Sequence, residues 1–188
     1  MPSASNVSAG KPKVTGAVYR AAAGTSSPTD ATTSLASAYK ELGYCSDDGL
    51  VNSNSPSVTK IKAWGGDVVL TLQEDKEDTF KLTLIEVLNT EAIKAVYGSS
   101  NVSGALGTGL TVSADASVPE EGVWAIDMVL NSNTVKRVVI PKGTVTELGD
   151  ITYSDSDAIG YEITIFAAPD SIGKTHYEYI KQTTSGNS

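Results

Sequence analysis

The chain has 188 residues, of which 40% are hydrophobic, so it is long enough for one well-buried domain, whereas two domains would be cramped. Its 22 acidic residues outnumber its 14 lysines and arginines, and the net charge of −8 argues against adhesion to nucleic acid or to anionic membranes. The single cysteine, Cys45, excludes an internal disulfide, and with the single histidine, His176, it leaves too few nitrogen and sulfur ligands for a zinc site.

Period-two patterns dominate the chain between two polar ends, and they predict a single domain over residues 14–182. Residues 1–13 are rich in Ser, Ala and Gly and lack the charged start and apolar stretch of a secretory signal, so we expect a flexible arm there. Residues 183–188 predict a flexible tail. No apolar run approaches the roughly 18 residues that a membrane-spanning helix needs.

The first part of the domain predicts a strand, a loop and a long irregular segment. We expect the strand at Gly16–Ala21 and a short helical turn at Leu35–Leu42. Turn-forming residues recur from Gly43 to Gly66, and such a segment in a compact domain is usually functional or mobile. It contains Trp64, which either covers the core or anchors a partner chain.

Two runs of alternating apolar residues come next, and they predict a β-hairpin. Its strands are "DVVLTLQ" (67–73) and "DTFKLTL" (78–84), and "EDKE" connects them. This interpretation places Glu74, Lys76, Glu77 and Asp78 at the hairpin tip.

The run "LNTEAIKAVYG" predicts a helix of about two turns, with Asn89 or Thr90 as its N-cap and Gly98 as its C-terminal stop. "GALGTGL" (104–110) predicts a flexible connection. The remaining predicted strands are Val123–Asn131 and Val135–Ile140 around "NSNT", Val145–Tyr153 paired with Gly160–Ala168, and Tyr177–Lys181. The predicted fold class is therefore mostly β: an antiparallel β-sandwich or barrel with one short flanking α-helix.

The chain carries no motif of a catalytic, cofactor or metal site. "GKT" (173–175) ends like a phosphate-binding loop, but Ala168 stands where that motif needs its first glycine, and strand-like residues follow it. A catalytic triad would need a nucleophile beside His176, and no sequence motif marks one. Cys45 is expected to be a partly buried small hydrophobe. The acidic runs at 46–49 and 154–157 lack the spacing of a calcium loop. We therefore expect no enzyme, no cofactor and no metal.

Several phrases stand in order from about Gly16 to Ile180, which is most of the chain. They are "GAVYRAAAGTSSPTDATTSL", "LGYCSDDGL", "IKAWGGDVVLTLQEDKEDTFKLTLIEVLN", "VYGSSNV" and "YEITIFAAPDSIGKTHYEY". With these phrases the chain resembles the major tail tube proteins of long-tailed phages with non-contractile tails. The phrase at 61–89 is the most specific.

The resemblance implies a structural virion protein that self-assembles. Such proteins fold as a β-sandwich or barrel with a flanking helix, form hexameric rings, and stack these rings into a hollow tube. A long loop or hairpin reaches the next ring. The implied partners are further copies of the chain, the tape-measure protein, the tail initiator and terminator proteins, and DNA that passes through the lumen without sequence-specific binding. The implied location is the virion tail, assembled in the cytoplasm of the host bacterium, with no membrane contact.

Two site hypotheses follow. The first places the contact between rings on the segment Gly43–Gly66, with Trp64 as its anchor; the residues assigned to it are Trp64, Gly65, Gly66, Asp67, Asp47, Asp48, Asn52 and Asn54. The second concerns the predicted "EDKE" tip, which either projects from the hairpin or faces the rim of the lumen.

Three other classes of protein stay open at this point. One is the inner tube of a contractile tail or injection system, which shares the fold. Another is a monomeric β-sandwich that binds carbohydrate, and the third is a small hydrolase on a β scaffold, which the missing motifs disfavour.

Overall fold

The computed structural model describes residues 2–13, 17–131 and 133–183. Residues 184–188 of the predicted tail (183–188) and the start of the first predicted strand, Gly16, lie outside the described residues. Two stretches of 3-10 helix, η1 (Ala4–Asn6) and η2 (Ser99–Asn101), accompany one α-helix, α1 (Thr90–Tyr97). The strands are β1 (Lys11–Pro12), β2 (Val18–Ala22), β3 (Lys40–Glu41), β4 (Val51–Lys62), β5 (Val68–Leu84), β6 (Val102–Ala105), β7 (Gly109–Val112), β8 (Gly122–Leu130), β9 (Thr134–Leu148), β10 (Tyr161–Ala167) and β11 (Tyr177–Gln182).

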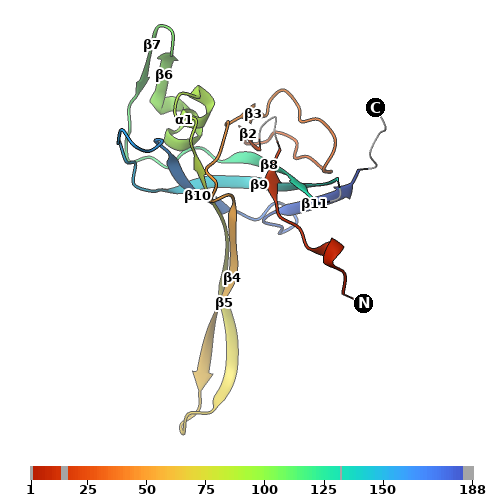
Figure 1. The fold of residues 1–188 in the computed structure, drawn as a ribbon. Coiled ribbons are helices and arrows are strands. Elements are labelled where there is room, and N and C mark those ends of the chain that lie inside the picture. Colours follow the sequence, from red (N-terminus) through yellow and green to blue (C-terminus); the bar gives the residue numbers. More distant parts are fainter. Residues whose placement is uncertain (1, 14–16, 132, 184–188) are drawn as a thin grey trace.

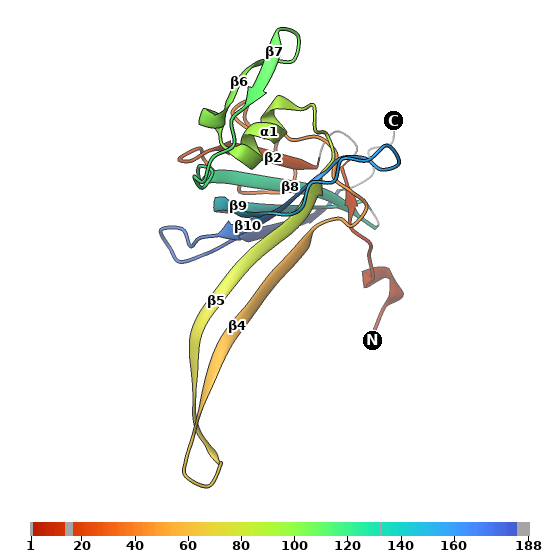
Figure 2. The same cartoon turned by 90° about the vertical axis from the view of Figure 1, so that its left-hand side faces the viewer.

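The main sheet is antiparallel and follows the order β3-β2-β8-β9-β10-β5-β4, while β1 pairs with β8 and β11 pairs with β9. Strands β6 and β7 form a separate hairpin. Figures 1 and 2 show a layered body, with α1 and the β6–β7 hairpin at one end and the long β4–β5 hairpin projecting from the other. The predicted mostly β, antiparallel fold with one short helix is confirmed.

Strand β9 pairs with three strands of the main sheet. Its residues 134–140 and Gly143 pair with β8, residues 134–139 pair with β11, and residues 143–148 pair with β10. The β8–β9 register shifts between Gly122 and Trp124, at the crossing where the other partner of β9 changes from β11 to β10. Val145, predicted to begin a separate strand, therefore lies within a single strand that ends at Leu148.

Gly143 lies at this crossing because a side chain would not fit there. A Cβ atom on Gly143 would lie 2.5 Å from Cδ1 of Trp124, whose Nε1 donates a hydrogen bond to the Gly143 carbonyl at 3.1 Å. The indole of Trp124 is fully buried and central to the core.

We expect Gly143→Ala to lower the free energy of unfolding by about 1–3 kcal/mol, because the added methyl overpacks the Trp124 ring. Urea denaturation measures this change. Gly107→Ala is the matched control, since a Cβ on Gly107 meets no atom within 4 Å. Equal midpoints for the two variants would contradict the overpacking argument.

Strand β8 is buried on both faces. Trp124 and Ile126 point into the main core, together with Phe80, Leu84 and the apolar side of α1. Val123 and Ala125 point the other way, into a smaller core that includes Tyr39. The segment from Gly24 to Tyr39 covers this second core; the Tyr39 hydroxyl donates to the Ser26 carbonyl at 2.9 Å.

A buried ion pair fastens the same covering segment to the sheet. Arg137 donates to both carboxylate oxygens of Asp127, at 2.6 and 2.8 Å, and both side chains are nearly inaccessible. Its remaining nitrogen donates to the carbonyls of Asp30 and Thr33. All three nitrogens of the guanidinium therefore donate hydrogen bonds within the chain.

Helix α1 is confirmed where the sequence predicted it. The Asn89 side chain is the N-cap and accepts hydrogen bonds from the backbone N–H groups of Glu91 and Ala92. Gly98 ends the helix with φ of 90°.

Two other predictions were wrong. Leu35–Leu42 forms no helix: a single turn, closed by a hydrogen bond from the Tyr39 N–H to the Ala36 carbonyl at 2.9 Å, leads into the short edge strand β3, where Lys40 and Glu41 pair with Arg20 and Tyr19. Of the predicted connection at 104–110, residues 104–105 and 109–110 lie in β6 and β7, and residues 106–108 form the turn between these strands.

Candidate interaction site on the β4–β5 hairpin

The β4–β5 hairpin projects from the body of the molecule. The two strands pair from Val51 opposite Lys81 to Lys62 opposite Val68. Pairing between β5 and β10 ends at Thr79 and Asp78 is buried against the body, so residues 68–77 extend beyond it. At about 3.3 Å per residue this projection is about 35 Å long. Figures 1 and 2 show the two strands leaving the body as a slender hairpin.

The turn of this hairpin lies at residues 63–67, and the predicted turn at "EDKE" was wrong. Residues 74–77 lie within β5, opposite β4. Gly65 and Gly66 have φ of 117° and 99°, which side chains rarely adopt, and the Ala63 N–H donates to the Asp67 carbonyl at 2.8 Å. The polar run predicted a turn because polarity marks exposure, and here Lys76 and Glu77 are exposed on a strand that lies outside the body.

The segment Gly43–Gly66, predicted as irregular, is in large part the strand β4. Its Ser and Asn residues and Pro56 have low strand propensity, but β4 is the last strand of its sheet, where proline is tolerated. The pairing with β5 supplies the backbone hydrogen bonds that the local sequence does not specify.

The structure brings together only part of the predicted contact set. Trp64, Gly65, Gly66 and Asp67 form the hairpin tip, and Trp64 is fully exposed, so it is not a lid over the core. The other four residues lie toward the body: Asp47 and Asp48 form a turn before β4, and Asn52 and Asn54 lie on β4 near its base. The role of Trp64 as an anchor stays a prediction.

The outer half of the hairpin carries a concentration of exposed apolar side chains. On one face Ile61 lies opposite Leu70, and Thr59 lies opposite Leu72. The other face is more polar, with Lys60 opposite Thr71. The exposed large apolar residues of the hairpin are Val51, Val58, Ile61, Trp64, Val68, Val69, Leu70 and Leu72. Contiguous exposed apolar surface of this kind marks an interaction site.

At its base the hairpin is joined to the body by a buried carboxylate. Asp78 accepts hydrogen bonds from Asn52 Nδ2 at 2.8 Å and from Thr175 Oγ1 at 2.5 Å, and it contacts His176 Nδ1 at 2.5 Å. The His176 ring packs edge-on against Phe80, with 5.1 Å between ring centroids. The "GKT" loop therefore fixes the direction of the hairpin, and its histidine pairs with a carboxylate.

Sequence reasoning missed Asp78 as a structural residue, although one signal was present. Phe80, Leu82 and Leu84 alternate along one face of β5, and all three are buried. Asp78 continues this alternation and so belongs to the buried face, where a carboxylate needs partners.

Asp78 gives the protein a pH dependence that we expect to be measurable. Burial raises the pKa of Asp78, but the hydrogen bonds from Thr175, His176 and Asn52 outweigh burial and leave the pKa below its usual value. Because the pKa in the folded state is the lower one, the stabilisation is complete above about pH 5 and is lost progressively as the pH falls below that. Asp78→Asn is therefore expected to lower stability by about 1–3 kcal/mol at neutral pH and to flatten the acid limb of a melting-temperature profile.

Asp47→Asn serves as the control for that profile, since Asp47 lies in an exposed turn. The assignment of the acid-dependent stability to Asp78 is wrong if the Asp78 and Asp47 variants lose the same amount of stability below pH 4.

The other titratable candidates have structural surroundings. Burial, assisted by the negative charge of Glu86, raises the pKa of the Cys45 thiol to about 11, so the predicted partly buried cysteine is confirmed. Asp170 accepts a hydrogen bond from Tyr177 at 2.6 Å and so raises the pKa of Tyr177 to about 12. Within the described residues, no three His, Cys, Asp or Glu side chains are grouped to hold a metal ion.

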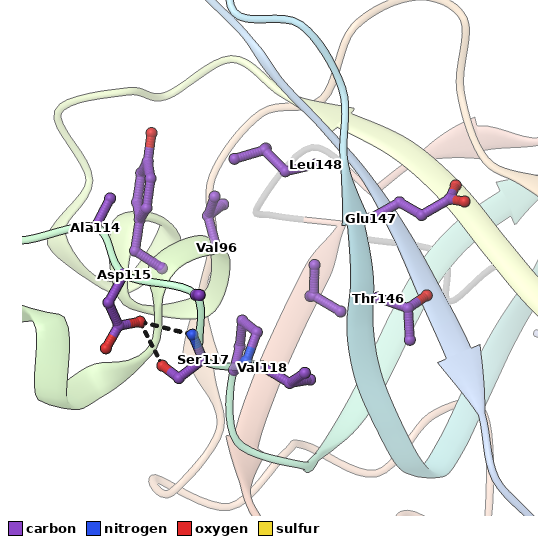
Figure 3. Close-up of a pocket in the computed structure, with 12 residues that line it drawn as sticks. Val96, Ala114, Asp115, Ser117, Val118, Thr146, Glu147 and Leu148 are labelled. Atoms are coloured by element: carbon purple, nitrogen blue, oxygen red, sulfur yellow. Dashed lines mark hydrogen bonds between the residues drawn. The ribbon is translucent and has the colours of Figure 1, made fainter.

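A pocket of about 350 Å³ lies beside α1, at the end of the body away from the hairpin. It is lined by the C-terminal end of α1, by residues 114–119 and by residues 145–148 of β9. Val96 and Leu148 point into it, whereas Glu147 points to the far side of β9 (Figure 3). Asp115 at its rim accepts hydrogen bonds from the Ser117 backbone and hydroxyl.

None of the helices in the described part of the chain is long and apolar enough to cross a membrane. A family model described as "Phage tail tube protein" matches residues 5–188. No curated protein matches the chain.

Proposed function

The chain belongs to the phage tail tube protein family, and from that premise we propose that it forms hexameric rings whose stacking, through the β4–β5 hairpin, builds a hollow tube for DNA. Membership of the family makes it a structural protein of the virion tail and not a member of an enzyme family. The ring number, the stacking contact and the passage of DNA belong to the proposal.

The hairpin is the observation that carries the proposal. It projects about 35 Å, exposes apolar side chains along both strands, and carries β4, the last strand in the order of the sheet. An element of this kind buries its apolar surface and its edge against another chain. In a protein that builds a tube, the available chain is a second copy.

The charge of the chain supports the passage of DNA. The net charge is −8, and a lumen lined with negative charge repels the phosphate backbone, so DNA slides without adhering. The proposed partners are the tape-measure protein inside the tube and the initiator and terminator proteins at its two ends. We place the chain in a non-contractile tail, assembled in the host cytoplasm; the inner tube of a contractile tail is the nearest alternative.

Negative-stain electron microscopy beside light-scattering mass measurement tests the proposal. We expect concentrated protein, with a tail initiator complex added where nucleation is slow, to give hollow tubes of uniform width built from six-fold rings. A strict monomer at every concentration, with and without the initiator, would overturn the proposal and favour a monomeric binding module.

A further inference from the structure

The hairpin tip and the pocket beside α1 lie at opposite ends of the molecule. Both views place the β4–β5 tip at one end and α1 at the other (Figures 1 and 2). The pocket is lined in part by Val96 and Tyr97 at the end of α1. When identical molecules stack along the hairpin axis in the same orientation, the tip of one therefore approaches the pocket end of the next.

The pocket suits one aromatic side chain. Its volume of about 350 Å³ falls at the lower end of the range for small-molecule clefts, roughly 300–1,000 Å³. Val96 and Leu148 supply apolar walls on opposite sides, and the exposed Val118 lies at its mouth (Figure 3). Trp64 is the largest exposed apolar side chain of the hairpin tip, and tryptophan is enriched among residues that anchor interfaces.

The charges of the two surfaces are complementary. The outer hairpin, residues 58–73, carries Lys60 and Lys62 against the single Asp67, which gives +1 in a chain whose net charge is −8. Asp115 stands at the rim of the pocket. Hydrogen bonds from Ser117 and Asn101 hold the pKa of Asp115 below its usual value, so this rim stays anionic.

We propose that Trp64 of one subunit inserts into the pocket between α1 and β9 of the next subunit along the tube, with Lys60 and Lys62 facing Asp115. This contact rests on the proposed function and names the surface that receives the hairpin. It joins two different patches of the same chain, so it is heterologous and extends without closing, as a stacked tube requires.

Cysteine cross-linking tests the contact. In a Cys45→Ser background, Trp64→Cys is combined with Val118→Cys, both at exposed positions. We expect oxidation of assembled tubes to link the subunits into covalent ladders. The control combines Trp64→Cys with Leu106→Cys, an exposed position on the β6–β7 turn at the same end of the molecule.

Tubes that form but link through position 106, or through neither position, overturn the pocket contact and leave the proposed function intact. A wild-type chain that forms no tubes overturns both. Because Trp64→Cys removes the proposed anchor, the wild-type protein supplies a second readout. The emission of Trp64, obtained by subtracting the Trp64→Phe spectrum, is expected to shift to the blue and to lose quenching by iodide on assembly, and an unchanged spectrum contradicts insertion.

The energetic expectation is that Trp64→Ala and Val118→Glu each raise the critical concentration for assembly by at least about tenfold. Because both remove the same contact, the double variant is expected to be little worse than either single variant. Fully multiplicative effects would show that the two residues act at separate contacts.

Discussion

Replacing residues 58–74 by Asn-Gly is expected to abolish tube formation while the body stays folded. The replacement joins Ser57 to Asp75, which lie opposite each other, and Asn-Gly suits a two-residue turn. The deleted part contributes to neither core, and its large apolar side chains are exposed. Its loss therefore removes interaction surface without removing buried contacts.

Electron microscopy measures the loss of tubes, and thermal denaturation measures whether the body stays folded. We expect no tubes at concentrations where the wild type assembles completely, and a melting temperature within a few degrees of the wild type. Shortening the β6–β7 turn by replacing residues 106–108 with Asn-Gly is the matched control. Normal tubes from the β4–β5 deletion would remove the hairpin from the proposed assembly mechanism.

Arg137→Met is expected to destabilise the body by about 3–5 kcal/mol, because it leaves Asp127 buried without its main partner. Lys13 approaches Asp127 only at 3.8 Å and is half exposed, so it does not replace the guanidinium. The carbonyls of Asp30 and Thr33 lose their donor at the same time. Unfolding in urea, followed by circular dichroism, measures the loss.

The double variant Asp127→Leu with Arg137→Met distinguishes a buried charge from a general packing defect. Removing both charges is expected to restore most of the stability, since the penalty comes from the unpaired carboxylate. Lys13→Met, which breaks only a half-exposed pair, is expected to cost less than about 1 kcal/mol. If Arg137→Met lowers the free energy of unfolding no more than Lys13→Met does, the Arg137–Asp127 ion pair does not stabilise the body as proposed.

Local signals in the sequence correctly predicted the elements that are determined by residues nearby in the chain. Asn89 and Gly98 mark the two ends of α1, and "NSNT" marks the turn between β8 and β9. The same local signals predicted the wrong turn in the β4–β5 hairpin. There the strand continues through a polar run because a partner strand supplies its hydrogen bonds, and no local pattern reports that pairing.

The eight residues predicted to form one contact lie in two separate places, because the sequence does not reveal the strand pairing. Trp64 and Asp67 were grouped with Asp47 and Asp48 because they are close in sequence. A hairpin separates such neighbours by its whole length, and it brings Asn52 close to Asp78 instead. The pocket beside α1 combines three segments that are distant in sequence, and so only the folded chain reveals it.

Because β5 runs without interruption from the hairpin to the buried Leu84, a pull on the tip along the hairpin axis loads the ladder between β5 and β10 in shear. The pairs from Tyr161–Leu84 to Phe166–Thr79 then share the force, whereas a sideways pull would open them one after another. A filament joined through such tips resists stretching with its full ladder of hydrogen bonds. It bends more easily, since bending requires only that the slender hairpin itself flex.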